Sequence, residues 1–259
     1  MVISFTQLGN YGRLGNQIFQ YAAVKSISIQ KKYEFKLPPT QMSIKSLNVR
    51  CGILNKKLNK IYKEKHFHYD HSVFMVSDDT DFSGYFQSWK YFDSIKDILE
   101  DEFSVDLFRY EKAKRKIEAC LYSNDKNIGV VSVHVRRGDY MKLPEHHPFC
   151  GIKYYNKAMS EFRALGRYMF YICSDDIGWC KDNIKGNDVV YSENDALTDL
   201  AIMNLSDHNI IANSSLSWWG AWLNKNPNKI VLYPSVWFGP KCPQDWYDLI
   251  PSGWEKTKV

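Results

Sequence analysis

The chain has 259 residues, enough for one large domain or two small ones, and its 44% hydrophobic and 24% charged residues are ordinary for a globular protein. The net charge of +5 favours anionic partners weakly, and no lysine- or arginine-rich block is dense enough to predict a nucleic-acid groove. No apolar run approaches the length of a membrane span. The six cysteines include no Cys-x-x-Cys pair and predict free thiols in a reducing compartment, so we expect a cytoplasmic protein.

The N-terminal stretch predicts a Rossmann-like opening. Residues 2–8 alternate like a strand, residues 9–16 form a glycine-rich turn, and a helix is expected from about 17 to 32. The N-terminus of such a helix attracts anions. A dinucleotide fold is the alternative, with Glu34 at a suitable distance for a ribose contact. Because the glycines recur at every third position and miss the Gly-x-Gly-x-x-Gly pattern, an NAD-dependent oxidoreductase is the weaker hypothesis.

Three histidines are crowded within the lysine-rich stretch over residues 36–70 and just after it, which we interpret as loops and short helices. They are His66, His68 and His71. A zinc site is one interpretation, but no cysteine or glutamate completes a recognised zinc spacing. A solvated loop is therefore the interpretation that we favour.

The sequence Asp79-Thr80-Asp81 matches the Asp-x-Asp pattern with which some enzymes hold a divalent cation. It lies before the predicted strand over residues 82–88 and not at the end of one. Turn-forming aspartates are therefore the better interpretation, and we expect no metal.

The chain divides at its clearest linker signal, Ser123-Asn-Asp-Lys-Asn127, which follows a charged amphipathic helix over residues 109–121. From residue 128 onward, strands and helices alternate, which predicts a parallel sheet with helices on both faces. We therefore predict an α/β protein with an N-terminal domain over residues 1–124 and a C-terminal domain over residues 125–259.

The most informative stretch runs from Val130 to Tyr140. It begins as an apolar, β-branched strand in which valines share one face while Ser132, His134 and Arg136 share the other. Gly138 then turns the chain. Open α/β sheets bind ligands beyond the carboxyl ends of their strands. A cluster of His, Arg, Arg and Asp at such an end is costly to bury without an anionic partner. The stretch predicts a phosphate or carboxylate site, and an internal Arg–Asp ion pair is the alternative.

Two other strand ends carry polar residues. The buried strand over residues 168–173 ends in Ser174-Asp175-Asp176, a natural helix cap. After the strand over residues 209–212, Asn213, Ser214, Ser215 and Ser217 open another helix. Plain capping needs one serine, so the surplus hydroxyls favour a phosphate contact.

Three segments resemble the α1,2-fucosyltransferases, the eleventh glycosyltransferase family. They are His134–Tyr140 (HVRRGDY), Gly12–Ala22 (GRLGNQIFQYA) and Gly84–Phe92 (GYFQSWKYF), and the resemblance extends over nearly the whole chain. It implies a GT-B-like fold with two Rossmann-like domains facing across a cleft, the N-terminal one on the acceptor side and the C-terminal one on the donor side. It also implies a metal-independent, inverting transfer of L-fucose from GDP-β-L-fucose to a galactoside hydroxyl in α-1,2 linkage.

The acceptor that the resemblance implies is a β-galactoside glycan, free or lipid-linked, and a lipid-linked acceptor would draw the enzyme to the inner membrane surface. A non-catalytic carbohydrate-binding protein is an alternative from another class, because the chain is rich in Trp and Tyr.

Site roles follow from the chemistry and from the resemblance together. Without a cation, negative charge on the departing pyrophosphate must be met by arginine, amides and a helix dipole. The residues expected to act at the reaction centre are Arg13, Asn16, Arg136 and Asp139. Those expected to bind the donor are His134, Arg136, Arg137, Asp175, Asp199, Asn213, Ser214, Ser215 and Ser217. Arg136 is the expected phosphate clamp, assisted by Ser215 or Ser217. His134 and Asp199 are expected at the nucleoside, with Asp199 on guanine or else a surface helix residue. Asp139 is either the base or the partner of Arg137.

Overall fold

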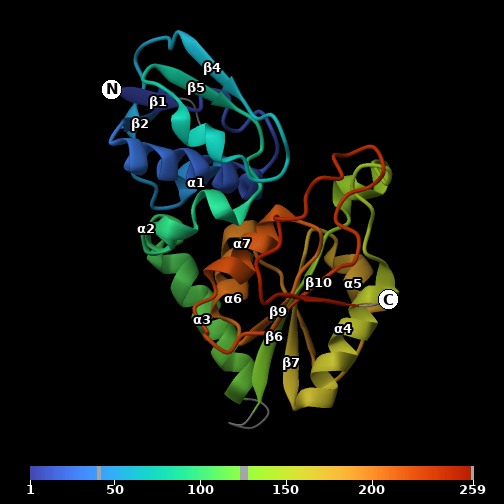
Figure 1. Cartoon of the computed structure of the whole chain (residues 1–259). Helices are drawn as coiled ribbons and strands as arrows, with labels where there is room; N and C mark the ends of the chain where they lie inside the picture. The colour runs from blue at the N-terminus through green and yellow to red at the C-terminus, as the bar shows by residue number, and fades with distance from the viewer. Residues whose placement is uncertain (40–41, 123–127, 258–259) are drawn as a thin grey trace. The chain divides into compact units, whose positions relative to one another are not determined.

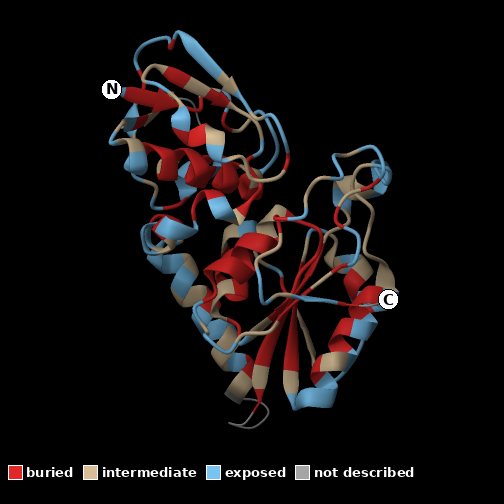
Figure 2. Ribbon diagram, viewed as in Figure 1, coloured by how far each residue is buried: buried red, intermediate tan, exposed pale blue. Residues whose placement is uncertain are grey.

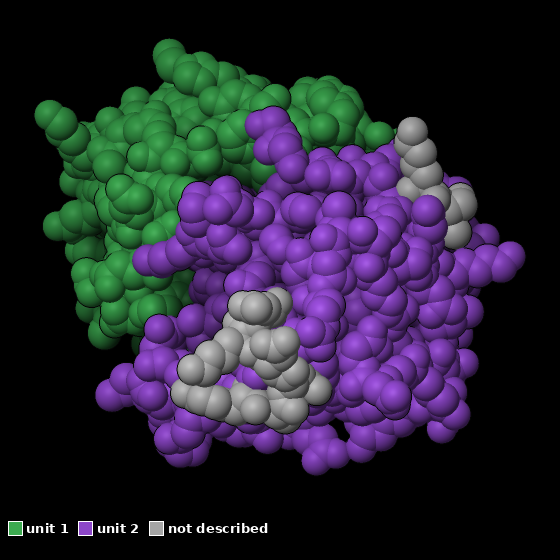
Figure 3. All heavy atoms as spheres, turned by 90° about the horizontal axis from the view of Figure 1, so that it is seen from below, with its two compact units in different colours: residues 1–106, 243–251 green, residues 107–242, 252–259 purple. Residues whose placement is uncertain are grey.

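The computed structural model describes residues 1–39, 42–122 and 128–257, and the chain forms two compact units (Figure 3). The first unit comprises Met1–Asp106 and Pro243–Pro251, and the second comprises Leu107–Cys242 and Ser252–Val259. The predicted linker at residues 123–127 lies outside the described residues. The second unit begins earlier than the predicted domain, because helix α3 (Leu107–Tyr122) packs against helix α6 (Ala196–Leu205).

The first unit contains a five-stranded parallel sheet in the order β3-β2-β1-β5-β4 (Figure 1). The strands are β1 (Val2–Ser4), β2 (Glu34–Leu37), β3 (Gly52–Ile53), β4 (Lys60–Lys63) and β5 (Thr80–Ser83). Helix α1 (Leu14–Lys31) connects β1 to β2 and buries most of its residues, so the predicted strand–turn–helix opening is confirmed. The short helices are η1 (Ser43–Ser46), η2 (His71–Met75), η3 (Trp89–Tyr91), η4 (Asp93–Ile95) and α2 (Lys96–Glu102).

The prediction that residues 36–70 are only loops and short helices is wrong, since β3 and β4 lie there. Strand β4 is an edge strand in which Lys60, Ile61 and Lys63 are all exposed. Lysines on an edge strand discourage pairing with other chains, and they also remove the apolar alternation by which a strand is recognised in sequence.

The second unit contains a six-stranded parallel sheet in the order β11-β10-β9-β6-β7-β8. The strands are β6 (Gly129–Val135), β7 (Tyr168–Ser174), β8 (Val189–Tyr191), β9 (His208–Ile210), β10 (Val231–Tyr233) and β11 (Glu255–Lys256). Its other helices are η5 (Gly138–Lys142), α4 (Gly151–Leu165), α5 (Ile177–Asn183) and α7 (Ser215–Leu223). Counted from β6, this is the Rossmann order, which reverses between β6 and β9. Ligands of such sheets bind at that reversal, beyond the carboxyl ends of the strands.

The two faces of β6 are occupied as predicted. Val131, Val133 and Val135 are fully buried in an apolar cluster with residues of α4 and α5. On the opposite face, which α3 and α6 cover, Ser132 Oγ accepts a hydrogen bond of 2.7 Å from Asn209 Nδ2. Strands β6 and β7 are buried along most of their length (Figure 2), so the residues that follow them are held on a rigid base.

Candidate active site

Arg136 follows β6 at the reversal of strand order and is held by two carboxylates. Its Nη1 lies 2.8 Å from Asp175 Oδ2, and its Nη2 lies 2.5 Å from Asp139 Oδ1. The guanidinium also lies over the Tyr140 ring, 5.2 Å from its centroid. Asp175 comes from the end of the neighbouring strand β7 and also accepts the Arg137 amide at 3.0 Å. The structure therefore contains the Arg–Asp ion pair that was the alternative, and it forms at Arg136.

Arg137 has different partners, so the alternative in which it pairs with Asp139 is wrong. Its Nε lies 3.0 Å from Asp176 Oδ2, and its guanidinium lies between two aromatic rings, 5.0 Å from Phe149 and 4.6 Å from Trp179. Asp176 is the N-cap of α5 and accepts the Trp179 amide, which confirms the predicted cap. These contacts give Arg137 a structural role within the loop between β6 and α4.

The residues after β9 are not equivalent. Asn213 is fully occupied, because its Nδ2 donates to the carbonyls of Pro148 and Trp237 at 2.9 Å each. The hydroxyl of Ser217 is buried and donates to the carbonyls of Ala212 and Ser214. Ser214 is the N-cap of α7 and makes no side-chain cap bond, and Ser215 is partly exposed. Ser214, Ser215 and the first amides of α7 are thus the groups best placed to meet an anion.

His134 lies on the face of the sheet that carries Ser132, and Asp199 lies on α6, which covers that face. His134 is 4% exposed, and its Nδ1 has no hydrogen-bond partner within the described part of the chain. Burial, assisted by the charge of Arg136, lowers the pKa of His134 to about 3, so the ring is neutral. Its neighbour in the sheet register is Cys173 of β7.

Asp199 lies in the first turn of α6 and is 6% exposed, so the surface-residue alternative is wrong. Its carboxyl accepts hydrogen bonds from the hydroxyl of Ser192 and the thiol of Cys173. Burial, assisted by the charge of Asp195, raises the pKa of Asp199 to about 7. A carboxyl group in this state lacks enough donors to hold its charge, and it would gain from a ligand that supplies N–H groups.

In the first unit, two of the segments that resemble the family lie against each other. Asn16 Oδ1 accepts from Gln87 Nε2 at 2.9 Å, and Gln20 Nε2 donates to the Gly84 carbonyl at 3.1 Å. Arg13 is exposed at the N-cap of α1. Gly12 has φ +92°, and a Cβ there would overlap the Asn16 side chain, so only glycine fits this turn.

The Asp-x-Asp pattern is divided between a turn and a strand. Asp79 has φ +66° and accepts from Lys56 Nζ at 2.9 Å, as a turn residue does. Asp81 instead lies within β5, where its carboxylate accepts from the amide and the hydroxyl of Thr6. The interpretation of both aspartates as turn residues is therefore wrong for Asp81.

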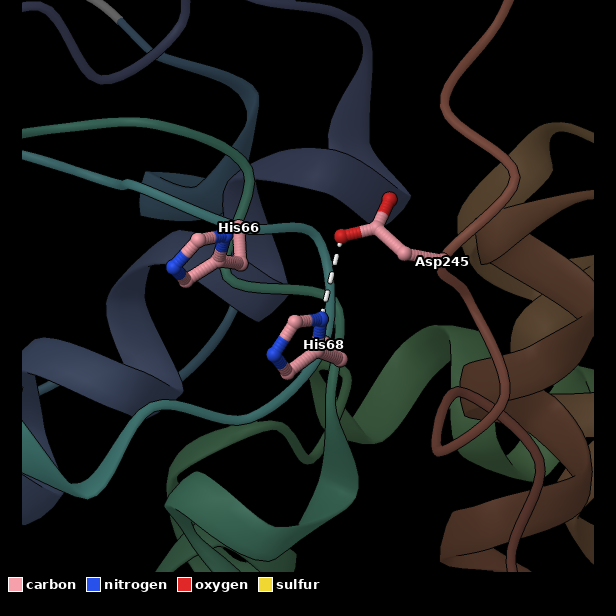
Figure 4. A group of neighbouring side chains, drawn as sticks. All are labelled: His66, His68 and Asp245. Carbon is pink, nitrogen blue, oxygen red and sulfur yellow. Dashed lines mark hydrogen bonds and ion pairs between the residues drawn. The ribbon is translucent and has the colours of Figure 1, made fainter.

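His66 and His68 lie beside Asp245, which belongs to the C-terminal segment of the first unit (Figure 4). Each residue offers a possible ligand atom, all within 4.8 Å of one another. The two rings, however, are stacked 4.8 Å apart at 13°, so their in-plane lone pairs do not converge on one ion. Asp245 Oδ2 is 3.0 Å from His68 Nδ1 and accepts the Phe67 amide at 2.9 Å. The group therefore fastens Pro243–Pro251 to the loop that follows β4.

Two α/β units, each with a parallel sheet, are the architecture of a GT-B glycosyltransferase, so the predicted α/β, GT-B-like fold class is confirmed for the units themselves. A sequence model of the family described as glycosyl transferase family 11 matches residues 4–239. The chain belongs to this family, the α-1,2-fucosyltransferases, and it is a glycosyltransferase.

Curated relatives and solved structures agree with this membership. An α-1,2-colitosyltransferase of Escherichia coli is 28% identical, over 91% of this chain and 95% of the relative. The O-antigen biosynthesis glycosyltransferase WbnK of E. coli is 33% identical, over 60% of this chain and 54% of the relative. A galactoside 2-α-L-fucosyltransferase of Bos taurus is 25% identical, over 82% of this chain and 62% of the relative. Crystals of the NodZ α-1,6-fucosyltransferase soaked with GDP-fucose show a similar fold, with a TM-score of 0.56, 11% identity and coverage of 86% and 92%.

Among the described residues, no helix is both long and apolar enough to cross a membrane.

Replacing Arg137 by Ala should lower the free energy of unfolding by about 1–2 kcal/mol, because the variant loses two ring contacts and an ion pair. Urea unfolding followed by tryptophan fluorescence measures this loss. Exposed Lys142, changed to Ala, is the matched control and should change stability by less than about 0.5 kcal/mol. Equal stability of the two variants would show that Arg137 is not structural.

Proposed function

We propose that this chain transfers L-fucose from GDP-β-L-fucose to a galactoside hydroxyl of a glycan, forming an α-1,2 linkage with inversion and without a metal. The observation that carries the proposal is the position of Arg136 at the reversal of strand order in the second unit. The names of the relatives support the linkage and the galactoside acceptor, and structural neighbours soaked with GDP-fucose or co-crystallised with GDP support the donor.

Arg136 is the proposed phosphate clamp. Direct displacement at the anomeric carbon passes through an oxocarbenium-like state while charge builds on the departing pyrophosphate. Asp139 is 44% exposed and Asp175 is 24% exposed, so the pair with Asp139 is the weaker one. A phosphate oxygen then replaces Asp139 at Nη2, while Asp175 keeps the guanidinium in position. Ser214, Ser215 and the first amides of α7 meet the remaining phosphate oxygens.

Asp199 and His134 are the proposed nucleoside contacts. Guanine presents two neighbouring N–H donors, which suit a buried carboxylate whose donors among the described residues are a hydroxyl and a thiol. The unpartnered Nδ1 of His134 offers a further polar atom on the same face. Arg13 and Asn16 are the proposed contributions of the first unit to the reaction centre, and that unit is the proposed acceptor side.

We also propose a cytoplasmic enzyme, because all six cysteines are free thiols. The name of WbnK supports a surface-polysaccharide acceptor. If this glycan is carried on a lipid, the enzyme works at the inner membrane surface.

Incubation with GDP-fucose, a panel of β-galactosides and EDTA tests the proposed function. NMR analysis of the product should show an α-1,2-linked fucose, and EDTA should not abolish transfer. A second candidate is colitosyl transfer, which the name of one relative favours, and a colitosyl donor tested in parallel decides between them. Activity abolished by EDTA and restored by Mn²⁺ would contradict metal independence, and failure to transfer fucose to any acceptor would contradict the proposal.

The affinity for GDP should depend on pH through Asp199. The raised pKa of about 7 means that the carboxyl is largely protonated at pH 6 and ionised at pH 8, and only the ionised form accepts two N–H groups. Affinity should therefore rise about tenfold between pH 6 and pH 8, following the ionised fraction. Calorimetry measures this change, and His134 does not titrate in this range.

The control is Asp199→Asn, which should bind GDP about 1–3 kcal/mol more weakly at pH 8 and with a flatter pH profile. An unchanged profile, or equal affinity of the native protein for GDP and UDP, would remove Asp199 from the guanine site.

A further inference from the structure

Glu64 directly follows β4, at the carboxyl end of the sheet in the first unit. Its Oε2 accepts the Tyr85 amide at 2.6 Å, and its Oε1 accepts the Phe86 amide at 2.8 Å. The residue is partly exposed, and each oxygen retains a second lone pair. The two amides therefore fix the carboxyl group in one orientation while leaving it able to accept a proton.

The turn that orients Glu64 is rigid. Gly84 has φ +153°, and a Cβ there would lie 2.7 Å from Glu64 Oε2, so glycine permits this close approach. Phe86 has φ +53°, which is unfavourable for a residue with a side chain, and its fully buried ring packs edge-on against Phe5 and Phe82. Packing therefore holds a strained backbone in the conformation that points two amides at Glu64.

The surroundings of Glu64 suit a sugar. Tyr11 and Tyr85 are 37% and 39% exposed, and their rings lie 6.1 Å apart as an amphipathic aromatic surface. Tyr85 is also the residue whose amide donates to Glu64. Gln87, shortly after Gly84, donates a hydrogen bond to Asn16 near the start of α1.

Two other carboxylates of the first unit, Asp70 and Asp245, are poorer bases. Hydrogen bonds from Ser72 lower the pKa of Asp70. Burial raises the pKa of Asp245, but hydrogen bonds from Phe67 and His68 outweigh it and lower the pKa overall. A lower pKa means a weaker proton acceptor, so these groups do not compete with Glu64.

We propose that Glu64 is the general base of the transfer reaction. The inference rests on the proposed function. A carboxylate oxygen of Glu64 takes the proton of the acceptor hydroxyl while the hydroxyl oxygen forms a bond to the anomeric carbon. The bond from that carbon to the pyrophosphate oxygen breaks, and its electron pair leaves with GDP. Glu64 then returns the proton to water, so no oxidant, reductant or metal is required.

The acid–base properties of Glu64 fit this role. Burial raises its pKa to about 7, and the negative charge of Asp245 adds to the effect, although the two backbone hydrogen bonds oppose it. Tyr62 and Tyr91 also interact with it electrostatically. A base with a pKa near the working pH combines a useful ionised fraction with sufficient strength.

The test compares Glu64→Gln with the native enzyme in fucose transfer to a β-galactoside. At saturating donor, where the titration of Asp199 no longer limits the rate through donor affinity, loss of a general base should lower kcat by about 10²–10⁴-fold and remove the acid limb of the kcat profile near pH 7. GDP affinity and the melting temperature, measured in parallel, report whether the variant is folded. The companion variant Asp245→Asn removes a negative charge near Glu64, so it should keep most of kcat and move the acid limb to lower pH.

Two results would overturn the proposal while leaving the proposed function intact. One is a folded Glu64→Gln variant with kcat within a fewfold of native, and the other is a reduced kcat with the acid limb unchanged, as a purely structural role would give. If the native enzyme transfers no fucose, the proposed function fails. NMR titration of the Glu64 carboxyl with a β-galactoside then still decides, because a pKa that does not move with saturating galactoside excludes contact with the acceptor.

Discussion

The ion pairs of Arg136 with Asp139 and Asp175 are the interaction on which the site of the second unit depends. They join the ends of two adjacent central strands and place a guanidinium where the strand order reverses. Arg136 and Arg137 face three carboxylates, including Asp176, so an anionic donor cannot simply be added to the cluster. Exposed Asp139 is the partner that a phosphate can replace at least cost, since exposed ion pairs contribute little.

Two carboxyl groups share a pKa raised to about 7, Asp199 in the second unit and Glu64 in the first, and burial is the main cause in both. Their partners differ in kind. Asp199 accepts from the side chains of Ser192 and Cys173, which a ligand can displace. Glu64 accepts from two backbone amides, which fix its orientation. This difference is the physical reason for assigning ligand binding to Asp199 and proton transfer to Glu64.

Much of the second unit could be predicted from sequence, because β6 and β7 are apolar runs that end abruptly in charged residues. The alternation of side chains along a strand predicted which residues of β6 share a face. The partner of Arg136 could not be predicted, since Asp175 is brought to it by strand pairing and not by sequence spacing. The inward turn of Ser217 depends on helix geometry, which a count of serines does not show.

The first unit was harder to predict. Strand β4 lacks apolar alternation because it is an exposed edge strand, and Glu64 was missed along with it. Helix α3 groups with the second unit although the predicted boundary follows it, because a charged amphipathic pattern does not reveal which unit its buried face contacts. The sequence did contain a weak signal for the turn beside Glu64. Gly84 and Gln87 belong to a segment that resembles the family, and both contact α1.

The central claim is that Arg136 recognises the diphosphate of the donor, and calorimetry with GDP and guanosine tests it most directly. Native protein should bind GDP much more tightly than guanosine. Arg136→Ala should lose about 1.5–3 kcal/mol of that difference while its affinity for guanosine stays unchanged, and Arg136→Lys should recover only part of it. A folded Arg136→Ala variant that keeps the full preference for GDP would contradict the account, because the arginine would then serve only its ion pairs.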